Sequence, residues 1–107
     1  SGNDDQVVPM MSLGAKGVIS VASNIVPDVM IKMSHLCLED RFQEASKLQL
    51  DYMSLIDALF VEVNPIPVKA ALDLLGKEAG PLRLPLCDIS PANLDVLKVA
   101  MSRCGLL

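Results

Sequence analysis

Apolar residues recur at intervals of three and four along most of this chain, a spacing that predicts a mainly helical protein. One such stripe predicts a helix over residues 41–59, and it comprises Phe42, Ala45, Leu48, Tyr52, Leu55, Ile56 and Leu59. A second predicts a helix over residues 25–38, and it comprises Val26, Val29, Met30, Met33, Leu36 and Cys37. Asn24 is the expected N-cap of this second helix.

Residues that favour helix ends delimit three further helices. Asn3, Asp4 and Asp5 precede a short apolar stretch that Gly14 ends, so a helix is expected over residues 6–14 with these polar side chains as its cap. Another helix should have Asn64 as its N-cap, Pro65 in its first position, Leu75 at its end and Gly76 just beyond it. The last should have Ser90 as its cap and Pro91 as its first residue, and it should end near Cys104 at Gly105.

Residues 15–24, AKGVISVASN, break the helical pattern. Val18, Ile19 and Val21 are β-branched, which predicts a fully buried β-strand over GVISV. A buried strand without neighbours would leave several backbone groups unpaired, at about 1–3 kcal/mol each. Three arrangements would avoid this cost. The segment could pair with the same segment of another copy, it could pair with strands absent from this chain, or it could refold as helix. A helix, a glycine turn, an apolar strand and a helix in this order are typical of a parallel sheet covered by helices.

Composition and charge restrict the classes of function that are expected for this chain. Nine Lys and Arg against thirteen Asp and Glu give a formal net charge of −4, and the basic residues are scattered, so nucleic acid is not an expected partner. No apolar run is long enough to span a bilayer and no signal peptide is recognisable, so a cytoplasmic protein without a membrane partner is expected. The three cysteines, Cys37, Cys87 and Cys104, have no metal-ligand spacing and are expected to be reduced thiols.

Several strings, in the same order and with similar spacing, resemble the C-terminal part of the dihydrodipicolinate synthases. They are SGNDDQ, LGAKGVISVASN, FVEVNPIPVKAAL, LRLP and the terminal CGLL, and NPIPVK is the most specific of them. The resemblance extends over essentially the whole chain. It implies a mainly α fold made of the C-terminal portion of a (β/α)8 TIM barrel, with its helix 7, strand 8 and helix 8, followed by the C-terminal helical domain. Residues 1–40 would be the remnant of the last barrel units and residues 41–107 the helical domain, and the partners of GVISV would be the first and seventh strands.

The resemblance also implies an activity for the parent protein. The family condenses pyruvate with aspartate semialdehyde in lysine and diaminopimelate biosynthesis, as a lyase that forms a Schiff base on a lysine and uses no cofactor. That lysine lies on the sixth strand, which this chain does not contain, so the chain should hold no catalytic residue and be inactive alone. Its six lysines, Lys16, Lys32, Lys47, Lys69, Lys77 and Lys98, are expected at the solvated surface, with Lys69 the one to examine.

Three positions resemble residues that line the family's substrate cleft. Asn64 resembles an asparagine in the far wall near the semialdehyde, Ile19 a residue whose backbone carbonyl approaches pyruvate, and Gly2 a residue that contributes a backbone N–H. Capping and core packing are the competing explanations for Asn64 and Ile19. His35, the sole histidine, lacks ligand neighbours at suitable spacing, so no metal site is expected.

In the family, the helix after strand seven contributes to the contact that joins two dimers into a homotetramer. Met10, Met11 and Leu13 are adaptable apolar residues suited to such an interface, although core packing would also explain them. The isolated chain is expected to self-associate, because the surface that faces the missing barrel would be apolar and exposed. The alternatives are a segment of a sialic acid or keto-sugar acid lyase, or a freestanding helical interaction module.

Overall fold

The computed structural model describes all 107 residues and contains six α-helices, two 3₁₀ helices and no β-strand. The predicted mainly helical fold is therefore confirmed. The chain divides into two compact units, residues 1–53 and residues 54–107. The division into a barrel remnant over residues 1–40 and a helical domain over residues 41–107 stays a prediction, because compactness does not mark where a barrel ends.

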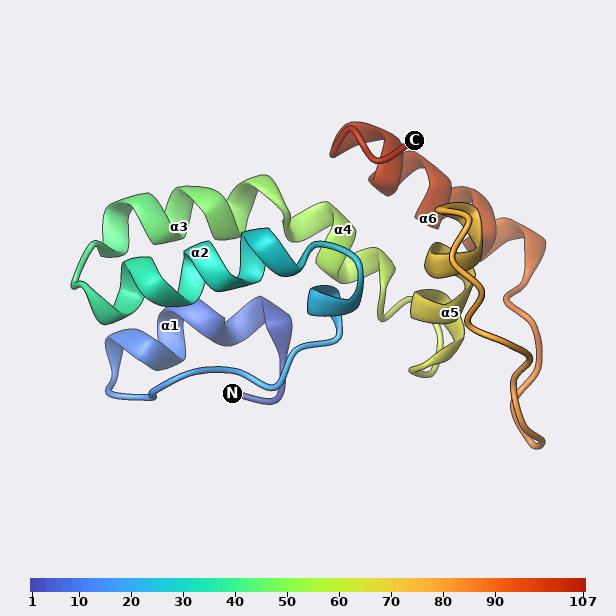
Figure 1. The fold of residues 1–107 in the computed structure, drawn as a ribbon, viewed down its shortest axis with the longest axis horizontal. Helices are drawn as coiled ribbons and strands as arrows, with labels where there is room; N and C mark the ends of the chain where they lie inside the picture. The colour runs from blue at the N-terminus through green and yellow to red at the C-terminus, as the bar shows by residue number, and fades with distance from the viewer. The chain divides into compact units, whose positions relative to one another are not determined.

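The first unit is built on three helices that pack against one another: α1 (Val7–Ser12), α2 (Pro27–Leu38) and α3 (Phe42–Asp51) (Figure 1). Two 3₁₀ helices, η1 (Asp4–Gln6) and η2 (Ala22–Asn24), precede α1 and α2. The predicted apolar face of α2 is buried in full, and Val7, Met33 and Ala45 are completely inaccessible to solvent. The 3.6-residue periodicity thus identified the buried face of α2 correctly, whereas Phe42 and Leu48 of the predicted α3 stripe are only half-buried.

The starts of the first helices differ from the prediction. Helix α2 begins at Pro27 with Val26 as its N-cap, and Asn24 lies in η2, where its side chain donates to the carbonyl of Val21. Proline explains the shift, because its fixed φ suits the first helical position and it has no N–H that needs a partner there. Asn3 makes no capping hydrogen bond either, although Gly14 ends α1 as expected with φ 108°.

The predicted buried strand over GVISV is wrong for this chain. Residues 15–20 run from the end of α1 to η2 in an extended conformation that pairs into no strand (Figure 1). The side chain of Ile19 is 87% exposed, and Val18 and Val21 are only partly covered. The β-branched residues favour the extended backbone, but burial needs neighbouring strands that these residues do not meet.

The second unit contains α4 (Met53–Ala58) except for its first residue, α5 (Ile66–Leu74) and α6 (Pro91–Arg103), with α5 packed against α6. Its core includes Leu55, Leu59, Leu97 and Met101, none of which is accessible to solvent. The single helix predicted over residues 41–59 is two helices, α3 and α4, because Tyr52 leaves the helical conformation with ψ 5°. Neither proline nor glycine lies at this break, so the sequence carries no signal for it.

Asn64 is not the N-cap of α5, which is a second correction. Pro65 occupies the cap position after a cis peptide bond, and the Asn64 side chain is exposed and makes no capping bond. A cap at Asn64 would need an N–H from Ile66 or Pro67. The N–H of Ile66 donates instead to the carbonyl of Val63 at 2.9 Å, and Pro67 has none.

The other predicted helix ends are confirmed. Gly76 follows α5 with φ 76°, and the N–H of Lys77 donates to the Leu72 carbonyl, as in a Schellman motif. The Ser90 hydroxyl accepts a hydrogen bond from the Asn93 N–H at the start of α6, and Gly105 follows its end with φ 75°. No helix is both long and apolar enough to cross a membrane.

Candidate functional site around Asp4 and the extended segment

Two backbone segments of the first unit lie side by side and bring two of the predicted site residues together. The Ser1 amino group donates to the Gly17 carbonyl at 2.8 Å, and the N–H of Ile19 donates to the Ser1 carbonyl at 2.8 Å. One residue bonded in this way to the two neighbours of Val18 is the pattern of a parallel β-bridge. Gly2, which follows Ser1 directly, therefore lies next to the backbone around Ile19.

The opposite edge of the extended segment has no partner in the chain. The N–H groups of Val18 and Ser20, which lie on that edge, make no hydrogen bond to protein. The carbonyl of Ile19 lies on the edge that faces Ser1, as does the N–H of the same residue, and it accepts no hydrogen bond either. Gly2 and Ile19 are both exposed. The Ile19 carbonyl, which the family resemblance assigns to the pyruvate site, is therefore free to meet a group from outside this chain.

Asp4 fixes the far end of the same segment. Its Oδ2 accepts hydrogen bonds from the backbone N–H groups of Val21 and Ala22, both at 3.0 Å, at the start of η2. The side chain is 1% exposed, and its Oδ1 is buried without any partner. A buried carboxylate is held best by such charge-assisted bonds, which are about twice as strong as neutral ones.

Gln49 ties Asp4 to the helices. It lies on α3, is 4% exposed, and its Nε2 donates to the backbone carbonyl of Asp4 at 2.6 Å. Its Oε1 accepts from the N–H of Val8 at 2.9 Å. Val8 is the second residue of α1, so its N–H has no partner within that helix. One amide side chain thus joins α3 to α1 and to the residue that anchors the extended segment.

Sequence reasoning assigned neither Asp4 nor Gln49 to the site, although both left a signal. Gln49 follows Ala45 by four residues, which puts a polar side chain on the buried face of α3. A buried polar side chain needs hydrogen-bond partners, and Gln49 finds them in the backbone. Asp4 was interpreted as a helix cap, but its carboxylate accepts hydrogen bonds from Val21 and Ala22, which lie 17 and 18 positions further along the chain.

Asn64, the third predicted site residue, belongs to the second unit. Its side chain is exposed, directly before Pro65. Nearby in the chain, the Glu62 carboxylate accepts from the Ser90 N–H and from the Asn93 side chain, both at 2.9 Å. These hydrogen bonds lower the pKa of Glu62, with the bond from Asn93 the larger cause. Glu62 therefore stabilises the start of α6 while it is charged.

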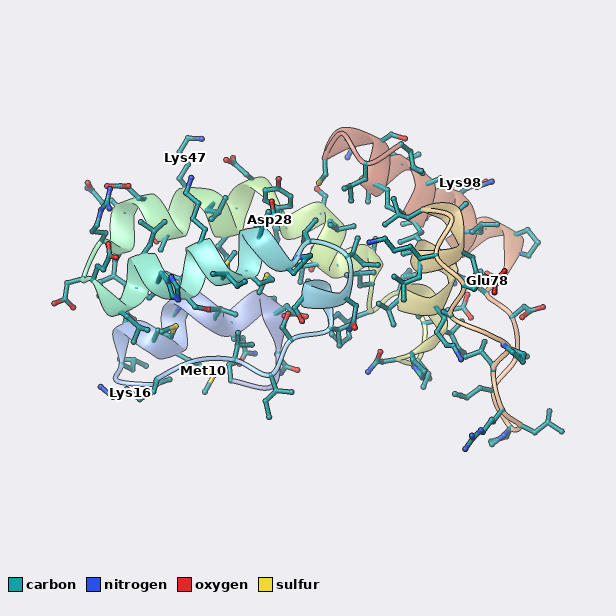
Figure 2. The ribbon with its side chains drawn as sticks, viewed as in Figure 1. Met10, Lys16, Asp28, Lys47, Glu78 and Lys98 are labelled. Atoms are coloured by element: carbon teal, nitrogen blue, oxygen red, sulfur yellow. The ribbon has the colours of Figure 1, made fainter.

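The lysine side chains lie at or near the surface. Lys16, Lys47 and Lys98 are exposed and extend away from the helices (Figure 2). Lys69 borders a groove between α5 and the loop before α6, but its Nζ donates to the Pro81 carbonyl at 2.9 Å. An amine held in this way at the surface lacks the desolvated setting that a Schiff-base lysine needs.

No group of three His, Cys, Asp or Glu side chains lies close enough to hold a metal ion. The three cysteines are free, and burial raises the pKa of the Cys37 and Cys104 thiols. His35 is exposed on α2.

Comparison with known proteins shows which proteins this chain resembles. The profile of the Dihydrodipicolinate synthetase family matches residues 1–103. A 4-hydroxy-tetrahydrodipicolinate synthase of Clostridium novyi is 54% identical over 101 residues, which are 94% of this chain and 34% of that protein. A 4-hydroxy-tetrahydrodipicolinate synthase 1 of Clostridium acetobutylicum is 50% identical over 107 residues, covering 100% of this chain and 36% of that protein.

Solved structures of dihydrodipicolinate synthases also match this chain. A crystal structure of a dihydrodipicolinate synthase matches with a TM-score of 0.98 and 44% identity, over 100% of this chain and 37% of that one. The dihydrodipicolinate synthase of Thermotoga maritima matches with a TM-score of 0.96 and 39% identity, over 100% of this chain and 36% of that one. These matches confirm the predicted fold class. The chain spans about a third of the length of the proteins it matches. By profile, sequence and backbone together, the chain belongs to the dihydrodipicolinate synthetase family.

Proposed function

We propose that this chain is the C-terminal segment of a lyase that condenses pyruvate with aspartate semialdehyde through a lysine Schiff base, in lysine and diaminopimelate biosynthesis. The observation that carries the proposal is the identity of 50% over all 107 residues with a 4-hydroxy-tetrahydrodipicolinate synthase. The match with a TM-score of 0.98 to a dihydrodipicolinate synthase also supports it. In the complete protein the segment would help to close the barrel and line one side of the cleft.

The hydrogen bonds of the extended segment support its place in a barrel. One parallel bridge exists between Ser1 and Val18, so a strand ending at Ser1 would extend the same ladder. The unpaired N–H groups of Val18 and Ser20 would donate to the carbonyls of a second strand on the other side. With both partners in place, the exposed side chain of Ile19 would be covered.

Within that barrel we assign three residues to the substrate cleft. Gly2 and Ile19, which lie beside each other, would offer a backbone N–H and a carbonyl near pyruvate. Barrel active sites lie at the carboxyl ends of the strands, which is where Ile19 would sit. Asn64 is exposed and makes no cap, so its amide is free to line the wall near the semialdehyde.

The apolar surface of α1 supports an assembly of the parent into a homotetramer. Leu13 is 89% exposed and Met10 is 38% exposed, whereas Met11 is buried in the core. Met10 also extends outward from α1 (Figure 2). Leu13 and Met10 would then belong to the contact between dimers, and Met11 to the core. The same exposure, with that of Ile19, leads to self-association of the isolated chain.

Borohydride trapping tests this function. The full-length protein that contains this segment is incubated with pyruvate and borohydride, and the modified lysine is located by peptide mass spectrometry. We expect one modified lysine outside the 107 residues, together with condensation activity. The isolated chain should remain unmodified and inactive. Modification of Lys69, or of any other lysine in this segment, would contradict the proposal.

A further inference from the structure

We propose that Asp4 is a positioning residue for the condensation reaction, acting through the backbone of residues 17–22. The inference rests on the proposed function. Asp4 would not touch a substrate, because its side chain is 1% exposed. Its task would be to hold the Ile19 carbonyl at a fixed place beside Gly2.

The extended segment is anchored at two points, and Ile19 lies between them. At one end Ser1 bonds to Gly17 and Ile19 through the bridge described above. At the other end the two N–H groups of Val21 and Ala22 converge on a single oxygen of Asp4. Only Ser20 separates Ile19 from the second anchor. A shift of residues 21 and 22 would therefore move the Ile19 carbonyl.

Asp4 is itself well placed to act as a fixed point. Its backbone carbonyl accepts from Gln49 on α3, and the same Gln49 side chain accepts from Val8 on α1. The anchor is thus connected to two packed helices and not to a loop. Catalytic geometry tolerates little error, since a displacement of about 1 Å can lower a rate by about 100-fold.

The test uses the full-length enzyme with three substitutions: Asp4→Ala, Asp4→Asn and Asp5→Asn. Asp5 is the matched control, because it is the neighbouring carboxylate but is exposed and makes no side-chain hydrogen bond. Kinetics with pyruvate as the varied substrate give kcat and KM separately. Hydrogen exchange measured at Val21 and Ala22 reports on the anchor itself and does not depend on activity.

We expect Asp4→Ala to lower kcat/KM for pyruvate by about 10- to 100-fold, with slower borohydride trapping and faster exchange at Val21 and Ala22. Asp4→Asn keeps an oxygen that accepts both bonds but loses the charge, so its loss should be at least about threefold and smaller than that of Asp4→Ala. Asp5→Asn should stay within about twofold of the wild type. If Asp4→Ala does not fold, Asp4→Asn decides.

Failure of the proposed function and failure of the proposed role of Asp4 would give different results. A wild-type enzyme with no condensation activity would overturn the proposed function. An active wild type whose folded Asp4→Ala and Asp4→Asn variants keep kcat and KM within about twofold would overturn the role of Asp4 alone. Reduced thermal stability with unchanged kcat and KM would likewise show that Asp4 only stabilises the fold.

Discussion

Replacing Gln49 by leucine should destabilise the first unit by a measurable amount. The Gln49→Leu change removes the bonds to the Asp4 carbonyl and the Val8 N–H and leaves both backbone groups buried without a partner. Each such group costs about 1–3 kcal/mol, so the two together cost about 4 kcal/mol. Burial of the leucine side chain offsets about 2 kcal/mol of this. The net loss in the free energy of unfolding is therefore about 2 kcal/mol, out of a typical total of about 5–15 kcal/mol.

Urea unfolding followed by circular dichroism, at one fixed protein concentration, measures this loss. For a chain of this size a loss of about 2 kcal/mol lowers the midpoint by about 1–2 M urea. Gln43→Leu is the control, because Gln43 lies on the same helix but is exposed and its side chain makes no hydrogen bond. Leucine and glutamine have similar helix propensities, so the control should change little. Midpoints of the two variants within about 0.5 M of each other would refute the assigned role of Gln49.

Three other outcomes follow from the structure. Hydrogen bonds at the start of α6 lower the pKa of Glu62 in the folded state, so the contribution of Glu62 to stability is present at neutral pH and is lost on acidification through that lowered pKa. Glu62→Gln should therefore flatten this part of the stability–pH profile. An unchanged profile would contradict this role of Glu62. Gly76→Ala should cost about 1–2 kcal/mol in thermal unfolding, because φ is 76° there, and Gly76→Asn should cost less; equal stability of all three proteins would be inconsistent with this. In the native protein iodoacetamide should label the exposed Cys87 first, since burial raises the pKa of Cys37 and Cys104. If mass spectrometry finds Cys37 labelled before Cys87, the predicted order of thiol reactivity is wrong.

Local pattern was sufficient where the structure depends on local interactions. The buried face of α2 followed from a 3.6-residue period, and the ends of α6 followed from Ser90 and Gly105, because capping involves only residues within one turn. The start of α5 was missed for an equally local reason, since the donors that Asn64 needed were engaged or absent.

The extended segment shows where local pattern is insufficient. GVISV has the composition of a buried strand, yet burial is supplied by neighbours far away in sequence, and Ile19 is exposed without them. For the same reason the anchor at Asp4 was not predicted, since its partners lie 17 and 18 residues away. Gly2 and Ile19 were identified through family resemblance, whereas Asp4 and Gln49 required the hydrogen-bond geometry.

Unpaired N–H groups on an uncharged, β-branched stretch are the template from which cross-β fibrils grow. Lys16 is the one charged residue between Asp5 and Asp28, and it is exposed directly beside that stretch. It therefore occupies the place of a gatekeeper, whose charge repels an incoming copy. In the isolated chain, where this edge is unpaired, loss of the single charge would remove that electrostatic protection.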